Sequence, residues 1–256
     1  MIFRKDPRVT GKEHYQRIYR EDLDDQAEWL RRSAREKVDS IERLLRENAI
    51  SPTTILELGC GTGAVILECQ RRGIADNYIA VDYSQHAIEY LKENSTGITA
   101  IAADITSTPT LPLECDVVIL SHVIEHIESP DQFLRSVGNL NFSYLIAEVP
   151  LEDLPAGKLK ACLSDRTRNP AGHVQFFTAT LFQRLLTSNG FTILNSRRYV
   201  PTLDLDTIRF VCRKNGWGFL RRMRMEATFT YLLPVLRPLW SKIYYAHYAA
   251  LCRKVS

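Results

Sequence analysis

Short apolar runs alternate with amphipathic stretches along the first 150 residues of the chain. Runs of this length that stop at glycine, aspartate, serine or proline are typical of strands buried in a sheet. Between them, apolar residues recur every three or four positions, which indicates helices. The pattern predicts strands at 54–58, 78–81, 98–103, 116–120 and 144–149, the last ending at Pro150, and helices at 64–73, 85–94 and 131–140. This alternation predicts an α/β domain with a parallel sheet.

Further elements are predicted on both sides of this region. Residues 22–48 carry apolar side chains at helical spacing and predict one or two helices. Residues 151–169 predict irregular structure or a brief helix, because the periodicity weakens there. A helix at 180–189 and a sixth strand at 191–199 follow, with a glycine between them that ends the helix.

The turn after the first strand, ILELGCGTG, contains Gly59, Gly61 and Gly63. Glycine permits positive φ and removes the Cβ atoms that keep a ligand away from the backbone. The following helix points unpaired N–H groups and the positive end of its dipole into the loop. Such a loop suits a nucleotide-like ligand with a carboxylate or phosphate. Gly59, Gly61 and Ala64 also satisfy the dinucleotide pattern G-x-G-x-x-G/A, so a nicotinamide cofactor is an alternative at this point.

Polar side chains mark the ends of the predicted strands. Glu57 lies in the first strand, Asp82 and Asp104 follow the second and third, and Ser121 and His122 follow the fourth. In an open α/β sheet the ligand lies at the carboxyl ends of the strands, and an acid about 20 residues beyond the glycine loop is placed to meet a ribose hydroxyl. A nucleotide-like ligand is therefore expected at this edge.

Four segments in this order resemble the motifs of the class I S-adenosylmethionine (SAM)-dependent methyltransferases: ILELGCGTG, AVDYS at 80–84, AADI at 102–105 and DVVILSHVIEHIESP at 116–130. The resemblance covers roughly residues 12–200 and is nearest to the small-molecule group of the ubiquinone/menaquinone or glycan type. It implies a Rossmann-like, seven-stranded, mostly parallel sheet with helices on both faces and an antiparallel seventh strand beside the sixth, at about 245–253. The chain then divides into an N-terminal helical cap at 1–53, a SAM-binding α/β core at 54–200, a helical insertion at 201–242 and the final strand at 243–256.

The resemblance implies SAM as the cofactor and S-adenosylhomocysteine (SAH) as its product. Asp82 would accept hydrogen bonds from both ribose hydroxyls, as a carboxylate does well. Asp104 and the backbone of Ile105 would meet the adenine, and Tyr83 would flank it. Plain alternatives are turn caps for the two acids and a surface position for the tyrosine. The expected cofactor-binding residues are Glu57, Gly59, Gly61, Gly63, Asp82, Tyr83, Asp104, Ile105 and Ser121, of which Glu57 would bond loop amides and Ser121 would act through its backbone.

Three histidines, His122, His126 and His173, lie where an acceptor would enter. A helical turn would place the first two on one face. Because a neutral imidazole takes a hydroxyl proton near pH 7, we expect His126, His122 or His173 to be the catalytic base. The alternatives are structural roles in their loops and catalysis by alignment alone. Together with Glu125, the first two also have the ligand types of a metal site, but methyl transfer from a sulfonium needs no Lewis acid, so no metal is expected. Surface or packing roles are expected for the remaining histidines, His14, His86 and His247.

Composition narrows the classes of function. Of the 256 residues, 45% are hydrophobic and 25% charged, as in ordinary globular chains, and the net charge of +3 does not by itself indicate a nucleic-acid partner. The segment LSHVIEH stands where amine and nucleobase methyltransferases often carry an Asn/Asp-Pro-Pro-Tyr/Phe motif, which argues against DNA. The expected reaction is O-methylation of a small hydroxylated acceptor: a glycan, a glycolipid precursor, a quinone-like compound or a secondary metabolite. The alternatives are a catalytically silent SAM-binding scaffold or regulatory subunit, and an RNA methyltransferase.

The predicted insertion mixes aromatic and apolar side chains with several arginines between residues 217 and 242. This mixture suits a helix lying on an anionic membrane, a lid over the acceptor, a dimer contact or a helical pair packed on the core.

Six scattered cysteines without a C-x-x-C pair favour a reducing compartment. No apolar run approaches the ~20 residues that span a bilayer. We therefore expect a cytoplasmic protein, with peripheral contact at the inner face of the membrane as an option and the oligomeric state open.

Overall fold

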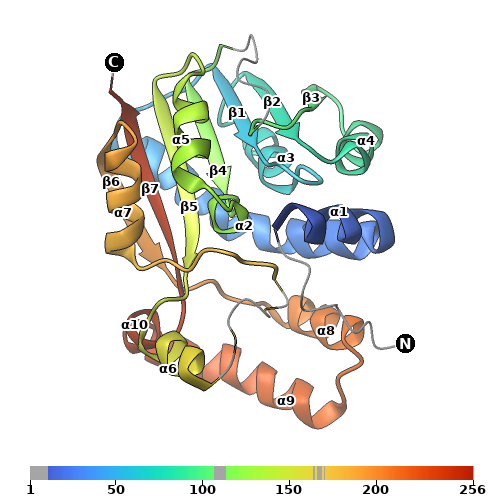
Figure 1. Cartoon of the computed structure of the whole chain (residues 1–256). Coiled ribbons are helices and arrows are strands. Elements are labelled where there is room, and N and C mark those ends of the chain that lie inside the picture. Colours follow the sequence, from blue (N-terminus) through green and yellow to red (C-terminus); the bar gives the residue numbers. More distant parts are fainter. Residues whose placement is uncertain (1–10, 107–113, 164, 166–168, 170, 256) are drawn as a thin grey trace.

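Seven strands form one sheet in the part of the chain that the computed structural model describes, residues 11–106, 114–163, 165, 169 and 171–255 (Figure 1). They are β1 (Thr54–Leu58), β2 (Asn77–Asp82), β3 (Ile98–Ala102), β4 (Val117–Ser121), β5 (Tyr144–Leu151), β6 (Phe191–Tyr199) and β7 (Ala246–Lys254). Their order is β3-β2-β1-β4-β5-β7-β6, and β7 is antiparallel to both of its neighbours while the other pairs are parallel. The predicted fold class is confirmed.

Helices cover both faces of the sheet because successive strand residues point to opposite sides. In β4, Val118 and Leu120 belong to one apolar cluster, and Val117 and Ile119 belong to the other. The first cluster includes residues of α5 (Pro130–Gly138) and α7 (Ala179–Ser188), and the second includes residues of α2 (Leu23–Glu47), α3 (Ala64–Arg71) and α4 (Gln85–Glu93). A sheet covered on both faces leaves the carboxyl ends of its parallel strands as the place for a ligand.

Two further helical parts flank the sheet. α1 (Gly11–Glu21), which the sequence pattern did not predict, precedes α2, and its Gly11 N–H donates to the Gly172 carbonyl at 3.1 Å. The expected insertion is helical and comprises α8 (Leu205–Lys214), α9 (Phe219–Ala227), the π-helix η2 (Thr228–Leu232) and α10 (Leu233–Ile243). With α6 (Pro155–Leu163), α9 and α10 lie at the lower edge of the molecule in Figure 1.

The prediction that the fifth strand ends at Pro150 is wrong. β5 runs on to Leu151, and Pro150 pairs with His247 of β7. β4 ends opposite Glu148, so Pro150 has a partner in β7 alone, before Leu151 forms an isolated bridge with Phe177. A proline is tolerated where its nitrogen faces such an open side, because no ladder hydrogen bond is lost. The other predicted strands and core helices agree with the structure within two residues at each end.

Candidate active site

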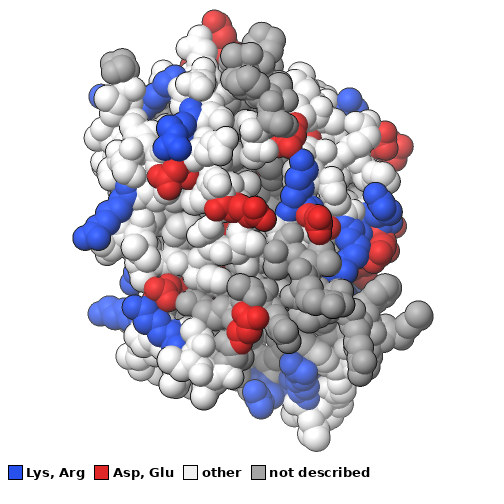
Figure 2. Space-filling view, in the orientation of Figure 1, with Lys and Arg blue, Asp and Glu red and all other residues white. Residues whose placement is uncertain are grey.

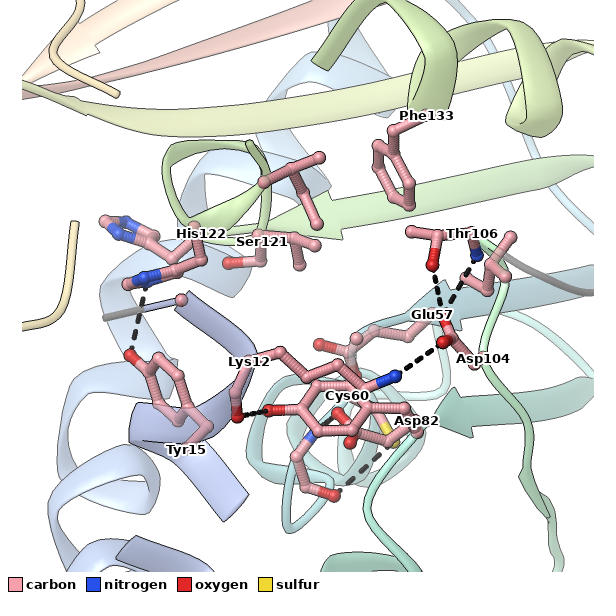
Figure 3. Close-up of a pocket in the computed structure, with 18 of the residues that line it drawn as sticks. Lys12, Tyr15, Glu57, Cys60, Asp82, Asp104, Thr106, Ser121, His122 and Phe133 are labelled. Carbon is pink, nitrogen blue, oxygen red and sulfur yellow. Dashed lines mark hydrogen bonds and ion pairs between the residues drawn. The ribbon is translucent and has the colours of Figure 1, made fainter. Parts of the chain in front are cut away.

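A cavity of about 740 Å³ lies at the carboxyl ends of β1 to β4, and α1 and α2 contribute to its walls (Figure 3). Cavities that hold cofactors and small ligands usually measure about 300–1,000 Å³. Ten of the predicted site residues line it: Glu57, Gly59, Gly61, Asp82, Tyr83, Asp104, Ile105, Ser121, His122 and His126. Gly63 and His173 are not part of the wall: Gly63 is the residue before α3, and the His173 ring packs on His126.

The glycine loop can be built only from glycines at its closest approaches. Gly61 has a φ of +55°, and a Cβ there would lie 2.3 Å from the Tyr19 hydroxyl of α1. Gly59 has a φ of +72°, and its Cβ would lie 2.6 Å from a methyl group of Val123. Both contacts are shorter than real carbon atoms allow, and both backbone conformations disfavour other residues. The loop is therefore clamped between α1 and the segment after β4.

Two buried acidic side chains hold this loop and the helix after it in place. Asp82 accepts the Gly61 N–H at one oxygen and the Ser84 N–H at the other, each at 2.8 Å. Glu57 accepts the Ile66 N–H of α3 at 2.9 Å, so it bonds the helix that follows the loop and not the loop amides that we expected. Burial raises the pKa of Asp82, although its backbone hydrogen bonds act in the opposite direction. Burial also raises the pKa of Glu57 to about 8. Each carboxylate oxygen has a second lone pair, so Asp82 retains acceptor capacity for a ligand.

Three residues from separate segments form a chain of contacts at the cavity, of which Figure 3 labels Lys12 and Asp104. The Tyr83 hydroxyl donates to the Lys12 carbonyl at 3.0 Å, and the Lys12 ammonium lies 2.6 Å from Asp104. Burial alone would raise the pKa of Asp104, but the hydrogen bonds from Lys12 and Thr106 lower it to about 2. Asp104 is therefore an ionised acceptor at neutral pH.

The sequence patterns missed residues that α1 and α2 bring to the cavity, chiefly Tyr15, Tyr19 and Lys37. Lys37 is 8% exposed, and burial lowers its pKa. The neighbouring Glu148, Glu125 and Glu57 act in the opposite direction and raise it. A signal existed, because Lys37 interrupts the helical spacing of the buried residues Ala34, Val38 and Ile41. A lysine in the apolar stripe of a helix needs buried acids to balance it. Lys37 thus brings a positive charge to the cavity wall.

His126 lines the cavity beside Tyr15, which lies across the cavity from Asp104 in Figure 3, and the His173 ring packs on His126 from outside the wall. The Nε2 atom of His126 is 3.2 Å from the Tyr15 hydroxyl, and its Nδ1 is 3.2 Å from the Gly172 carbonyl. Burial lowers the pKa of His126 to about 4, so the ring is neutral at pH 7. Because a carbonyl only accepts, Nδ1 carries the proton and Nε2 is free to accept one. The Nδ1 atom of His173 is 2.5 Å from Glu152.

His122 faces the same Glu125 oxygen as His126 but belongs to a second group of polar side chains. The helical turn expected across both residues is wrong, because the short 3₁₀ helix η1 (Ile124–His126) begins after His122, whose φ is +59°. Its Nε2 is 3.1 Å from Glu148, and its Nδ1 is 3.1 Å from Glu125. Burial and Lys37 oppose protonation, but the two carboxylates raise the pKa of His122.

His247 of β7 completes this group, although the sequence offered no context for it. Its Nδ1 lies 3.1 Å from Glu148 and 3.2 Å from the Nε2 of His122. Burial and the neighbouring His122 lower the pKa of His247 to about 4. No local pattern could reveal this contact, since the two histidines are 125 positions apart.

Comparison with known proteins agrees with the geometry. The profile of a family described as a methyltransferase domain matches residues 19–196, more than half of the 256 residues. The ubiquinone biosynthesis O-methyltransferase of Rickettsia canadensis is 37% identical over 94 residues, 35% of this chain and 39% of that protein. The match thus spans about two-fifths of the relative's length.

Solved structures share the fold. The magnesium protoporphyrin IX methyltransferase of Synechocystis PCC 6803 with bound SAH superposes with a TM-score of 0.55 at 16% identity, over 86% of this chain and 83% of that chain. The cyclase SpnF superposes with a TM-score of 0.58 at 16% identity, over 84% of this chain and 80% of that chain. These identities show the fold alone. With the family match across the sheet and its glycine loop, the chain belongs to the class I SAM-dependent methyltransferase family.

Proposed function

We propose that the protein transfers a methyl group from SAM to a hydroxyl oxygen of a small molecule. The observation that carries this proposal is one cavity with two ends: the glycine loop and strand-end acids at one, and His126 with Tyr15 at the other. Ile127, Gln132 and Phe133 add a mixed apolar and polar part to the wall of this cavity. The names of the relatives support a quinone-like ring as the acceptor.

The cofactor would lie along the carboxyl ends of β1 to β3. Asp82 would accept the ribose hydroxyls, since its oxygens keep lone pairs beyond their two backbone bonds. Asp104 and the backbone of Ile105 would meet the adenine beside Tyr83, and the glycine loop with the Ser121 backbone would face the methionyl part. Bound SAM supplies a methyl group already activated by its sulfonium. The chain therefore has to align an acceptor oxygen, which contributes on the order of 7–11 kcal/mol.

Among the three candidate histidines, His126 fits the role of base best. It lines the cavity, and the Nε2 atom of its neutral ring accepts a hydrogen bond. In this structure the donor to Nε2 is the Tyr15 hydroxyl. His122 has carboxylates at both nitrogens, and the Nδ1 of His173 is held by Glu152 behind the wall. An acceptor hydroxyl that replaces Tyr15 would pass its proton to Nε2 of His126. Glu125, 4.0 Å from that nitrogen, would offset the charge that forms.

The proposal is tested by incubating the protein with SAM and a series of hydroxylated aromatic acceptors, with the matching methoxy compounds as controls. Formation of SAH together with an O-methylated product, identified by mass spectrometry, supports it. SAM binding without turnover on any acceptor favours the silent scaffold. Because a [4+2]-cyclase shares this fold, the fold alone does not predict methyl transfer, and turnover must be measured. Binding of NAD in place of SAM refutes the cofactor assignment.

We further propose that the helical insertion contacts an anionic membrane. Large apolar side chains are exposed there, with exposed fractions of 62% for Phe219, 82% for Leu220 and 77% for Val235. α6 adds Leu159 and Leu163, exposed by 64% and 80%, at the same edge of the molecule in Figure 1. Exposed apolar area beside arginines suits an interfacial contact. In the described residues no helix is both long and apolar enough to span a bilayer.

The charge distribution gives less support to an RNA acceptor. On the face shown in Figure 2, lysine and arginine side chains are interspersed with aspartate and glutamate. RNA-binding domains typically gather basic side chains on one face or stripe. The net charge of +3 agrees with an interspersed pattern.

A further inference from the structure

Three donor atoms, one from the segment after β4 and one each from β5 and β7, converge beside the cavity, which His122 lines. The Nε2 of His122, after β4, lies 3.1 Å from Oε1 of Glu148 in β5 and 3.2 Å from Nδ1 of His247 in β7. The third side of this triangle, from His247 to Glu148, is 3.1 Å. We propose that His122, Glu148 and His247 bind a divalent transition-metal ion, with zinc as the preferred ion.

The triangle has the dimensions of a coordination face. Zinc binds imidazole nitrogen and carboxylate oxygen at about 2.0–2.1 Å, which places tetrahedral ligands about 3.3 Å apart. Two imidazoles with one carboxylate form a ligand set of zinc sites that keep a position open. Imidazole ligands select zinc, cobalt or nickel over magnesium, which prefers oxygen.

The outer partners of both histidines also match a metal site. Nδ1 of His122 lies 3.1 Å from Oε1 of Glu125, and Nε2 of His247 lies 3.2 Å from the Tyr245 hydroxyl. Metal-bound histidines almost always have their second nitrogen hydrogen bonded to a carboxylate, carbonyl or water, which fixes the tautomer and the ring orientation. Here each histidine directs its other nitrogen into the triangle. The positive φ of His122, +59°, is part of this orientation.

Hydrogen bonds alone account poorly for the same atoms. Oε1 of Glu148 faces His122, His247 and the Tyr199 hydroxyl, which is 2.7 Å away. The other oxygen of Glu148, although buried, has no hydrogen-bond partner among the residues that the structure describes. The two ring nitrogens cannot both donate to Oε1 and also bond one another at 3.2 Å. A cation resolves the conflict because all three atoms then contribute lone pairs.

The surrounding charge favours a cation as well. The carboxylates of Glu125 and Glu148 each lie 3.1 Å from a nitrogen of His122. The buried ammonium group of Lys37 interacts electrostatically with both carboxylates. Two negative charges against one positive charge leave the site net negative. The ion would join the ends of β4, β5 and β7, so binding is expected to stabilise the fold whether or not methyl transfer occurs.

The test uses full-length, tag-free protein stripped with a chelator and then given Zn²⁺, Co²⁺ or Mg²⁺. One equivalent of zinc should remain after gel filtration, and cobalt should give the visible absorption of a low-symmetry site. An excess of 100-fold over the dissociation constant should raise Tm by about 5–10 °C, with no such rise from magnesium.

Variants locate the site. His247→Gln and Glu148→Gln should each lose the bound equivalent and the Tm shift. The matched control His86→Gln changes an exposed histidine of α4 and should keep both. Using two variants guards against misfolding, because circular dichroism of each metal-free protein shows which remains folded. The proposal is overturned if the wild-type protein retains no zinc, or if folded variants bind zinc as tightly as the control.

Discussion

Replacing Asp82 by asparagine is expected to lower both the stability of the ligand-free protein and its affinity for SAM. The carboxylate accepts backbone N–H groups of Gly61 and Ser84 at 2.8 Å and is 4% exposed. Asparagine accepts on one side alone, so one buried N–H loses its partner. A hydrogen bond to a charged group contributes about 1.5–3 kcal/mol, and we expect the free energy of unfolding to fall by that amount. The lost ribose contacts should weaken SAM binding by about 1–3 kcal/mol, or roughly 5- to 150-fold.

Denaturant titration of the empty protein and calorimetry with SAM separate the two effects. Asp76→Asn is the matched control, because Asp76 is exposed just before the other end of β2. Lowered stability with unchanged SAM affinity would restrict Asp82 to holding the glycine loop and remove it from the ribose site. If neither quantity differed from that of the control, the account of the loop given above would be refuted.

Three further outcomes are expected. Burial raises the pKa of Glu57 to about 8, so the folded protein holds a proton that the unfolded chain releases above about pH 4.5. The wild type should therefore lose stability between these pH values by up to about 1.4 kcal/mol per unit, and Glu57→Gln should lose less in parallel denaturations. His126→Ala should lower kcat by about 10²-fold or more with SAM affinity nearly unchanged, whereas a normal rate would indicate alignment alone. Arg221→Glu with Arg222→Glu should abolish salt-sensitive flotation with anionic liposomes and spare turnover of a soluble acceptor; wild-type flotation would contradict the membrane contact.

Local pattern was enough to predict most of the sheet. The apolar run at 54–58 is β1 without a shift, and the run at 191–199 is β6. Strands that are buried on both faces and bounded by glycine or acid have few competing interpretations. The same regularity brought Asp82, Asp104 and Ser121 to one edge, because parallel strands end together.

The remaining parts of the site depend on contacts that no local pattern encodes. Tyr15 and Lys37 reach the cavity because α1 and α2 fold back across the strand ends, and the sequence of neither segment shows that path. His247 meets His122 because β7 enters the sheet beside β5. The helix α1 was missed since its residues are mostly polar and it buries only Gly11, His14 and Tyr19. Packing against the site, and not propensity, stabilises such an element.

The place of β7 between β5 and β6 has a consequence for biosynthesis. β7 follows all the other elements in chain order, yet it fills an interior position of the sheet. A nascent chain can form the β3-β2-β1-β4-β5 half while β6 still has no strand to pair with, because domains take shape as the chain emerges from its N-terminal side. The two longest ladders then close in one late step across large sequence separations, which slows folding. Until that step the free edges of β5 and β6 are open to pairing with other chains. A chaperone that shields these two edges would raise the yield of native protein more than one that binds the N-terminal half.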